Sequence, residues 1–232
     1  MFTNEDTRSK RAVLWDVDGT LSDSYLLGYT CTLTVLAKNG YEPISEEEYH
    51  AGTRYATPDR FAWHLTRDTN SDVGPRLGKQ FDDLYVGMVS SSTAGFFPGM
   101  SELLTELNAE WGDTIHFGAL SNACGSYVQA VLRANCVDSM FSVALGADQV
   151  SAPKPHPDGL LKICEQLDVH PSMCVYIGDS PSDGQAATAA GMHSIGVTWG
   201  SHAVENVIPA FIHTVSTVDQ LREYIDQFLV RP

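Results

Sequence analysis

The chain has 232 residues, 43% of them hydrophobic, and a formal charge of −15 from 29 acidic and 14 basic residues. The hydrophobic content excludes an overall disordered chain, and the charge argues against nucleic acid and anionic membranes as partners. No stretch approaches the roughly 20 apolar residues of a membrane span, and the cysteines lack the paired spacing of a disulfide framework or zinc site. Segment 1–11 is polar without an apolar signal core, so we expect a cytoplasmic protein.

The first third of the chain predicts one strand followed by helices. The apolar run 12–15 indicates a buried strand. From residue 22 onward the pattern changes: leucines recur at helical spacing, Ser45 begins a capping-box sequence, and Thr57 offers an N-cap before a proline. The helical pattern stops at segment 90–93, which reads SSST.

Strands alternating with helices resume after this block. The predicted strands cover Ile115–Leu120, Phe141–Leu145, 174–177 and 194–197. Such alternation is typical of a doubly wound, mostly parallel α/β sheet. We therefore expect an α/β catalytic core formed by residues 1–21 and 94–232, with residues 22–93 inserted as an all-helical cap.

Polar residues follow four of the predicted strands. They are Asp16 and Asp18, Ser121 and Asn122, Lys154, and Asp179 and Asp183. Ligands of doubly wound sheets bind beyond the carboxyl ends of the strands. We therefore expect four carboxylates, a hydroxyl and an ammonium to face one crevice.

These groups suit phosphoryl transfer. Asp16 can attack phosphorus, which splits hydrolysis into two easier steps, and can give an oxygen ligand to Mg²⁺. Asp18 can protonate the leaving oxygen and later activate water, and Gly19 permits a tight turn. Ser121 with nearby backbone N–H groups can hold phosphoryl oxygens, while Lys154 attracts the phosphate.

The charges at these positions favour a bound cation. Asp16, Asp18, Asp179 and Asp183 carry four negative charges when all are ionised, whereas Lys154 and one Mg²⁺ return three positive ones. A phosphate dianion would upset this balance unless one carboxyl is protonated. Asp18 is the natural holder of that proton, because neighbouring anions raise a carboxyl pKa.

Four motifs resemble, in order and spacing, those of haloacid-dehalogenase-like (HAD) hydrolases. They are DVDGT at 16–20, Ser121, KP at 154–155 and GDSPSD at 178–183. Segments 23–24, 97–99 and 196–200 extend the likeness over nearly the whole chain. The resemblance implies a HAD-like Rossmannoid core with a helical cap between the first and second motifs.

The resemblance also implies the metal ligands. Mg²⁺ would be bound by the carboxylates of Asp16 and Asp179 and by the backbone carbonyl of Asp18. Asp183 would lie nearby and steer the metal waters or Lys154. Mg²⁺ is thus the cofactor that we expect.

Within this family the closest likeness is to phosphoglycolate-phosphatase-like proteins. We therefore expect a phosphoric monoester hydrolase, monomeric or homodimeric, that acts on a small phosphorylated metabolite. Substrate choice would come from the cap, where a basic residue can read a second anion. Arg54 is the first candidate, because segment 52–54 lies where related caps place a recognition loop, and Arg60 is the next.

Two alternatives remain open. A phosphomutase of the β-phosphoglucomutase type would share Asp16 and Asp18. The other is not an enzyme: a phospho-signalling receiver module also gathers aspartates, a hydroxyl residue and a lysine around Mg²⁺. Receivers, however, are shorter, lack a cap and carry the phosphorylated aspartate on the third strand.

Overall fold

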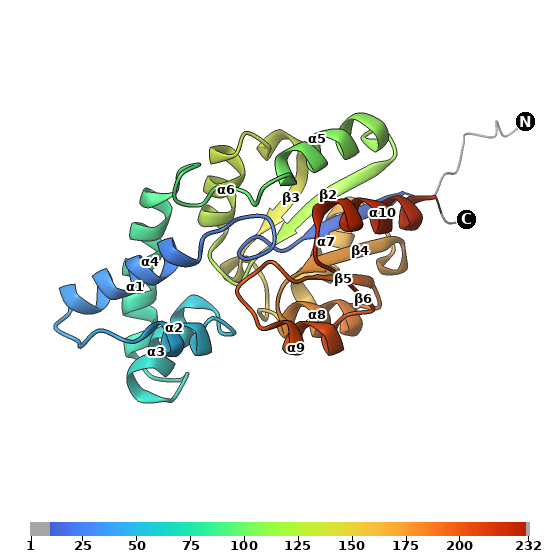
Figure 1. The fold of residues 1–232 in the computed structure, drawn as a ribbon. Helices are drawn as coiled ribbons and strands as arrows, with labels where there is room; N and C mark the ends of the chain where they lie inside the picture. The colour runs from blue at the N-terminus through green and yellow to red at the C-terminus, as the bar shows by residue number, and fades with distance from the viewer. Residues whose placement is uncertain (1–9, 231–232) are drawn as a thin grey trace, which may run out of the picture.

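The computed structural model describes residues 10–230, so most of segment 1–11 and both ends of the expected core lie outside the described residues. A parallel six-stranded sheet forms its centre, in the order β3-β2-β1-β4-β5-β6 (Figure 1). The strands are β1 Arg11–Trp15, β2 Ile115–Leu120, β3 Phe141–Leu145, β4 Cys174–Gly178, β5 His193–Val197 and β6 His213–Val215. The predicted doubly wound parallel sheet is confirmed.

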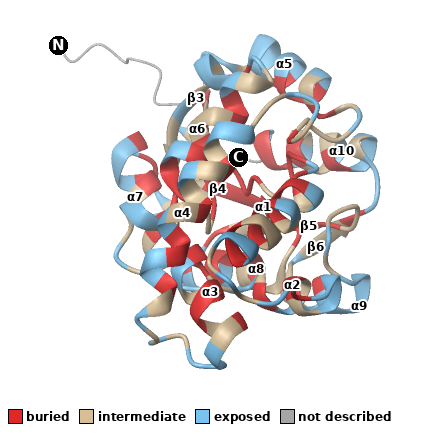
Figure 2. Ribbon diagram, turned by 90° about the vertical axis from the view of Figure 1, so that its left-hand side faces the viewer, coloured by how far each residue is buried: buried red, intermediate tan, exposed pale blue. Residues whose placement is uncertain are grey.

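Helices cover both faces of the sheet. They are α5 Met100–Trp111, α6 Gly125–Ala134, α7 Asp158–Leu167, α8 Pro181–Ala190, α9 Val204–Val207 and α10 Val218–Leu229. Val13 and Trp15 of β1 pack in one cluster with α5, α6 and α10, whereas Ala12 and Leu14 pack in another with α7 and α8. This alternation follows from the two-residue repeat of a strand, and the central strands are buried (Figure 2). Short 3₁₀ turns lie at Asp138–Met140, Ala147–Gln149, Pro171–Met173 and Ile208–Ala210.

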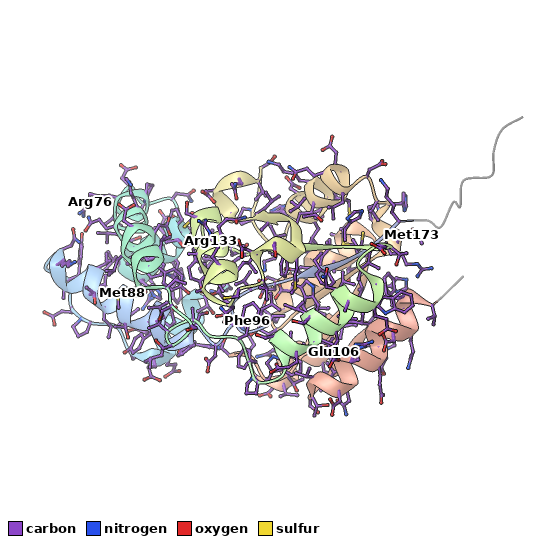
Figure 3. The ribbon with its side chains drawn as sticks, turned by 90° about the horizontal axis from the view of Figure 1, so that it is seen from above. Arg76, Met88, Phe96, Glu106, Arg133 and Met173 are labelled. Carbon is purple, nitrogen blue, oxygen red and sulfur yellow. The ribbon has the colours of Figure 1, made fainter. Side chains whose placement is uncertain are left out.

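Four further helices, which we call the helical segment, lie between β1 and α5. They are α1 Tyr25–Lys38, α2 Glu46–Gly52, α3 Thr57–Thr66 and α4 Val73–Met88. They gather at one end of the molecule, where Arg76 and Met88 mark α4 in Figure 3. The predicted capping box at Ser45 is confirmed. The predicted N-cap at Thr57 is wrong by one residue, because Ala56 holds that position and Thr57 begins α3.

The helical segment leaves and re-enters the rest of the fold at one place. Ser22 and Phe96 form an antiparallel bridge, the Asp23 N–H donates to the Gly95 carbonyl at 2.9 Å, and the Phe97 N–H donates to the Leu21 carbonyl at 2.9 Å. The two connecting segments, at Ser22 and Phe96, therefore run side by side. Within residues 10–230, no helix is long and apolar enough to cross a bilayer.

The order of the strands reverses between β1 and β4, which are hydrogen-bonded neighbours. Trp15 pairs with Ile177, and the Asp16 N–H donates to the Ile177 carbonyl at 2.8 Å. The loops that follow these two strands therefore start side by side. Such a reversal is where doubly wound sheets open a crevice for ligands.

Candidate active site

Three buried carboxylates meet at this reversal. Asp16 follows β1, Asp179 follows β4, and Asp183 lies in the first turn of α8. Each offers an oxygen within 4.8 Å of the others, and their exposures are only 5%, 3% and 0%. Ser180 fixes the start of α8 through a capping box with Asp183. These three residues, which were predicted from the sequence to face one crevice, lie together in the structure.

Lys154 lies among these carboxylates. Its Nζ is 2.6 Å from Asp16 Oδ1 and 2.7 Å from Asp183 Oδ1, and it also donates to the Tyr176 hydroxyl at 3.1 Å. Asn122 holds the Lys154 backbone from both sides, accepting from its N–H at 2.9 Å and donating to its carbonyl at 3.0 Å. Asn122 thus supports the site by positioning Lys154.

Burial and neighbouring charges shift the pKa values of the three carboxyl groups. Burial, followed by the charge of Asp183, raises the pKa of Asp16 to about 7. Burial and the charge of Asp16 raise the pKa of Asp179 well above its usual range. Burial would also raise the pKa of Asp183, but the charge and hydrogen bond of Lys154 keep it below the ordinary value. One lysine therefore does not balance three carboxylates.

The donor set fits a magnesium ion. Asp183 is occupied, because its Oδ1 accepts from Lys154 and Tyr176 and its Oδ2 accepts from Ser180. Asp16 Oδ2, by contrast, accepts only a 3.3 Å bond from Thr20. Asp179 accepts at Oδ2, from the backbone of the loop after β5. Asp16 and Asp179 therefore retain carboxylate oxygens of the kind that Mg²⁺ prefers.

Gly19 allows the loop after β1 to approach this cluster. Its φ is +80°, and a Cβ at this position would lie 2.3 Å from Asp179 Oδ2. Both the backbone conformation and the close contact require glycine. The expected tight turn at Gly19 is present, and it brings the segment that carries Asp18 against Asp179.

The carboxylate of Asp18 accepts hydrogen bonds from four hydroxyl groups. Ser24, Tyr85 and Tyr127 donate to its Oδ1 at 2.6, 3.1 and 2.6 Å, and Ser121 donates to its Oδ2 at 2.9 Å. Ser121 directly follows β2 and also accepts from the Ala123 N–H at 3.0 Å. The structure thus joins the expected acid–base residue to the expected phosphoryl-binding hydroxyl.

A cavity of about 410 Å³ opens above these residues. Its walls come from both parts of the fold: Asp16, Asp18, Ser121, Lys154 and Asp179 on one side, and Tyr49, Arg60, Phe81 and Tyr85 of the helical segment on the other. The helical segment therefore supplies the surface that a bound molecule would meet beyond the carboxylates.

Of the two basic candidates, Arg60 lines this cavity. It is 8% exposed, its Nε and Nη2 are buried without a hydrogen-bond partner, and its guanidinium lies 4.5 Å from the Phe81 ring centre. Arg54 lies in the exposed turn before α3 and stacks on Tyr55 at 4.8 Å instead. The structure therefore places Arg60, and not Arg54, among the residues that line the cavity.

Several residues of the site had no role assigned from the sequence. They are Thr20, Ser24, Tyr85, Tyr127 and Tyr176. Tyr176 lies in the predicted buried strand 174–177, and Tyr85 lies in the block that was predicted to be helical. Their hydroxyls were the available signal, because a buried tyrosine hydroxyl usually finds a hydrogen-bond partner.

Comparisons with known proteins agree with this geometry. The family model for haloacid dehalogenase-like hydrolases matches residues 13–197. Phosphoglycolate phosphatase of Escherichia coli K12 is 30% identical over 213 residues, covering 82% of each protein. A haloacid dehalogenase-like hydrolase structure from Bacteroides fragilis superposes with a TM-score of 0.80 at 28% identity, over 92% of this chain and 100% of that one. CbbY of Rhodobacter sphaeroides with xylulose-(1,5)bisphosphate shares the fold, with a TM-score of 0.78 at 22% identity over 89% and 93% of the chains.

Proposed function

The chain belongs to the haloacid dehalogenase-like hydrolases and is a phosphoric monoester hydrolase, and from this premise we propose that it hydrolyses a small phosphorylated metabolite through an aspartyl-phosphate on Asp16. The observation that carries the proposal is the placement of Asp16: it lies at the base of the cavity, paired with Lys154 at 2.6 Å. Phosphoglycolate is the first substrate to test, because the E. coli relative is named a phosphoglycolate phosphatase.

The proposed reaction has two steps. In the first, a carboxylate oxygen of Asp16 bonds to phosphorus while the ester bond breaks, and the leaving oxygen takes a proton from Asp18. In the second, water gives its proton to Asp18 and attacks phosphorus, which releases phosphate and restores Asp16. Lys154 holds Asp16 in place. The Ser121 hydroxyl, which donates to Asp18 in the structure, would turn to donate to a phosphoryl oxygen of the bound substrate.

The metal of this proposal is Mg²⁺. The carboxylates of Asp16 and Asp179, with the backbone carbonyl of Asp18, would hold it, and Asp183 would keep Lys154 in place from the opposite side. When bound, the ion supplies the positive charge that lets the carboxylate cluster accept a phosphate dianion.

We propose that residues 22–93 act as a cap over a core of residues 1–21 and 94–232. The cavity walls support this division, because the helical segment contributes Tyr49, Arg60 and Phe81 to them. A wall of this kind excludes water from the reacting groups and meets the leaving group. The cytoplasmic location and the monomeric or homodimeric state remain predictions.

The direct test is a screen of the purified protein for phosphate release from phosphorylated acids, sugars and nucleotides. Release without a bisphosphate activator supports a phosphatase and argues against a phosphomutase. The receiver alternative is disfavoured by the position of Asp16, which follows the first strand of the chain. If no phosphomonoester releases phosphate in the presence of Mg²⁺, the proposed function is wrong.

Replacing Arg60 should impair the hydrolysis of substrates with a second anion. Two nitrogens of the buried Arg60 guanidinium have no hydrogen-bond partner, which is costly, so we propose that a substrate anion compensates its charge. Arg60→Ala should reduce kcat/KM for such a metabolite. The corresponding loss of transition-state stabilisation is roughly 2–4 kcal/mol, the scale of losing a buried charged contact. For an aryl phosphate, which lacks the second anion, kcat/KM should fall far less.

Arg54→Ala is the matched control, because it removes an exposed guanidinium of the same segment that does not line the cavity. This variant should leave kcat/KM unchanged for both substrates. Equal losses on the two substrates with Arg60→Ala would show that Arg60 supports the structure of the helical segment instead.

A further inference from the structure

The two oxygens of the Asp18 carboxylate are bound unequally. Three hydroxyls, from Ser24, Tyr85 and Tyr127, donate to Oδ1, whereas only Ser121 donates to Oδ2. An ionised carboxylate has about four acceptor sites over its two oxygens. The three donors therefore saturate Oδ1, and an acceptor site is left at Oδ2.

Two of the three donors form a rigid pair. The rings of Tyr85 and Tyr127 stack at 4.0 Å with an angle of 10° between their planes, and both side chains are buried, at 5% and 0% exposure. Their hydroxyls donate to the same oxygen, Asp18 Oδ1, at 3.1 and 2.6 Å. Two stacked rings thus direct two fixed donors to one oxygen.

The pair joins two parts of the fold. Tyr85 lies on α4 of the helical segment, and Tyr127 lies on α6, which covers the sheet. The third donor, Ser24, immediately precedes α1. Asp18 is therefore held from both parts at once, and the Tyr85 hydroxyl reaches it from α4, which packs against α6.

We propose that Tyr85 and Tyr127 are positioning residues that hold Asp18 by Oδ1, so that Oδ2 is the oxygen that exchanges a proton with the leaving group. This inference rests on the proposed function, in which Asp18 is the acid and base. Oδ2 lies on the side of Ser121, the residue expected to bind the phosphoryl group. Because α4 supplies one of the donors, covering the cavity and orienting the acid are a single event.

The test uses Tyr85→Phe and Tyr127→Phe, which keep the stacked rings and remove one hydroxyl each. Hydrogen bonds to charged groups are the stronger class, so kcat/KM for an alkyl phosphate should fall about tenfold or more in each variant. With p-nitrophenyl phosphate, kcat/KM should change by less than about twofold, because its leaving group departs without a proton. The comparison uses kcat/KM because it covers only the steps up to the aspartyl-phosphate.

Tyr29→Phe is the matched control, since it removes a hydroxyl that donates to the Ile44 carbonyl at 2.9 Å inside the helical segment. This control variant should leave kcat/KM unchanged for both the alkyl phosphate and p-nitrophenyl phosphate. Equal losses on both substrates, or no loss on either, would overturn the inference. If a tyrosine variant fails to fold, Ser24→Ala removes the third donor to Oδ1 and should show the same selective loss. Wild-type protein inactive on both substrates would instead reject the proposed function.

Discussion

Asp16→Asn should abolish turnover while preserving the fold, with a loss of at least ~10³-fold, the scale seen when other covalent nucleophiles are removed. The amide is nearly isosteric with the carboxylate but is a poor nucleophile. Phosphate release from the best substrate of the screen measures the loss. Activity within tenfold of wild type would contradict the aspartyl-phosphate mechanism.

The same variant should not lose stability. Asp16 has a folded-state pKa raised from 3.8 to about 7, so its ionised form is disfavoured in the fold. A raised carboxyl pKa costs stability as the pH increases from about 4 towards 7, and a neutral amide avoids this cost. Thermal unfolding of the metal-free proteins at pH 8 should place Asp16→Asn at or above wild type. Asp83→Asn, which removes an exposed carboxylate on α4, is the control for both activity and stability.

Removal of the metal should be as damaging as loss of the nucleophile. Three buried carboxylates face a single lysine, so an excess of chelator should stop turnover and Mg²⁺ should restore it. Ca²⁺ should inhibit, because it is larger, takes more oxygen ligands and can engage both oxygens of Asp16. Full turnover in excess chelator, with the absence of metal measured, would contradict this prediction.

The metal prediction also has a readout that does not depend on activity. A ligand that binds only the folded protein raises its unfolding temperature, so Mg²⁺ should stabilise the wild type. Asp179→Ala removes an expected ligand and should abolish most of this stabilisation. Arg54→Ala, distant from the cluster, should retain it in full.

The sequence predicted that several polar side chains gather in one crevice, because each of them follows a strand. Asp16, Ser121 and Asp179 each follow a buried strand directly, and parallel strands end at one edge of the sheet. Once the strands are recognised, the position of these side chains follows from topology alone. Lys154 lies in a longer loop beyond β3, so topology predicts the edge of the sheet that it faces but not which carboxylates it contacts.

The cavity walls were harder to predict, because they depend on how helices pack. Arg54 and Arg60 are six positions apart, and only the packing of α3 against α4 decides which of them is buried. Tyr85 lies in the part of the chain that was predicted to be helical, but a helical pattern does not reveal where its hydroxyl points. The strand β6, which has three residues, was too short to give an alternating pattern.

The two connecting segments at Ser22 and Phe96 lie side by side, so the helical segment between them could be replaced by another insertion. Because the chain leaves and returns at adjacent positions, an insertion of another length or shape could be joined there without stretching β1 or moving the loop that carries Asp16. Selection can therefore remodel the surface that chooses the substrate while the phosphoryl-transfer machinery stays unchanged. A chimaera that carries a relative's insertion between these two connecting segments should inherit that relative's substrate preference.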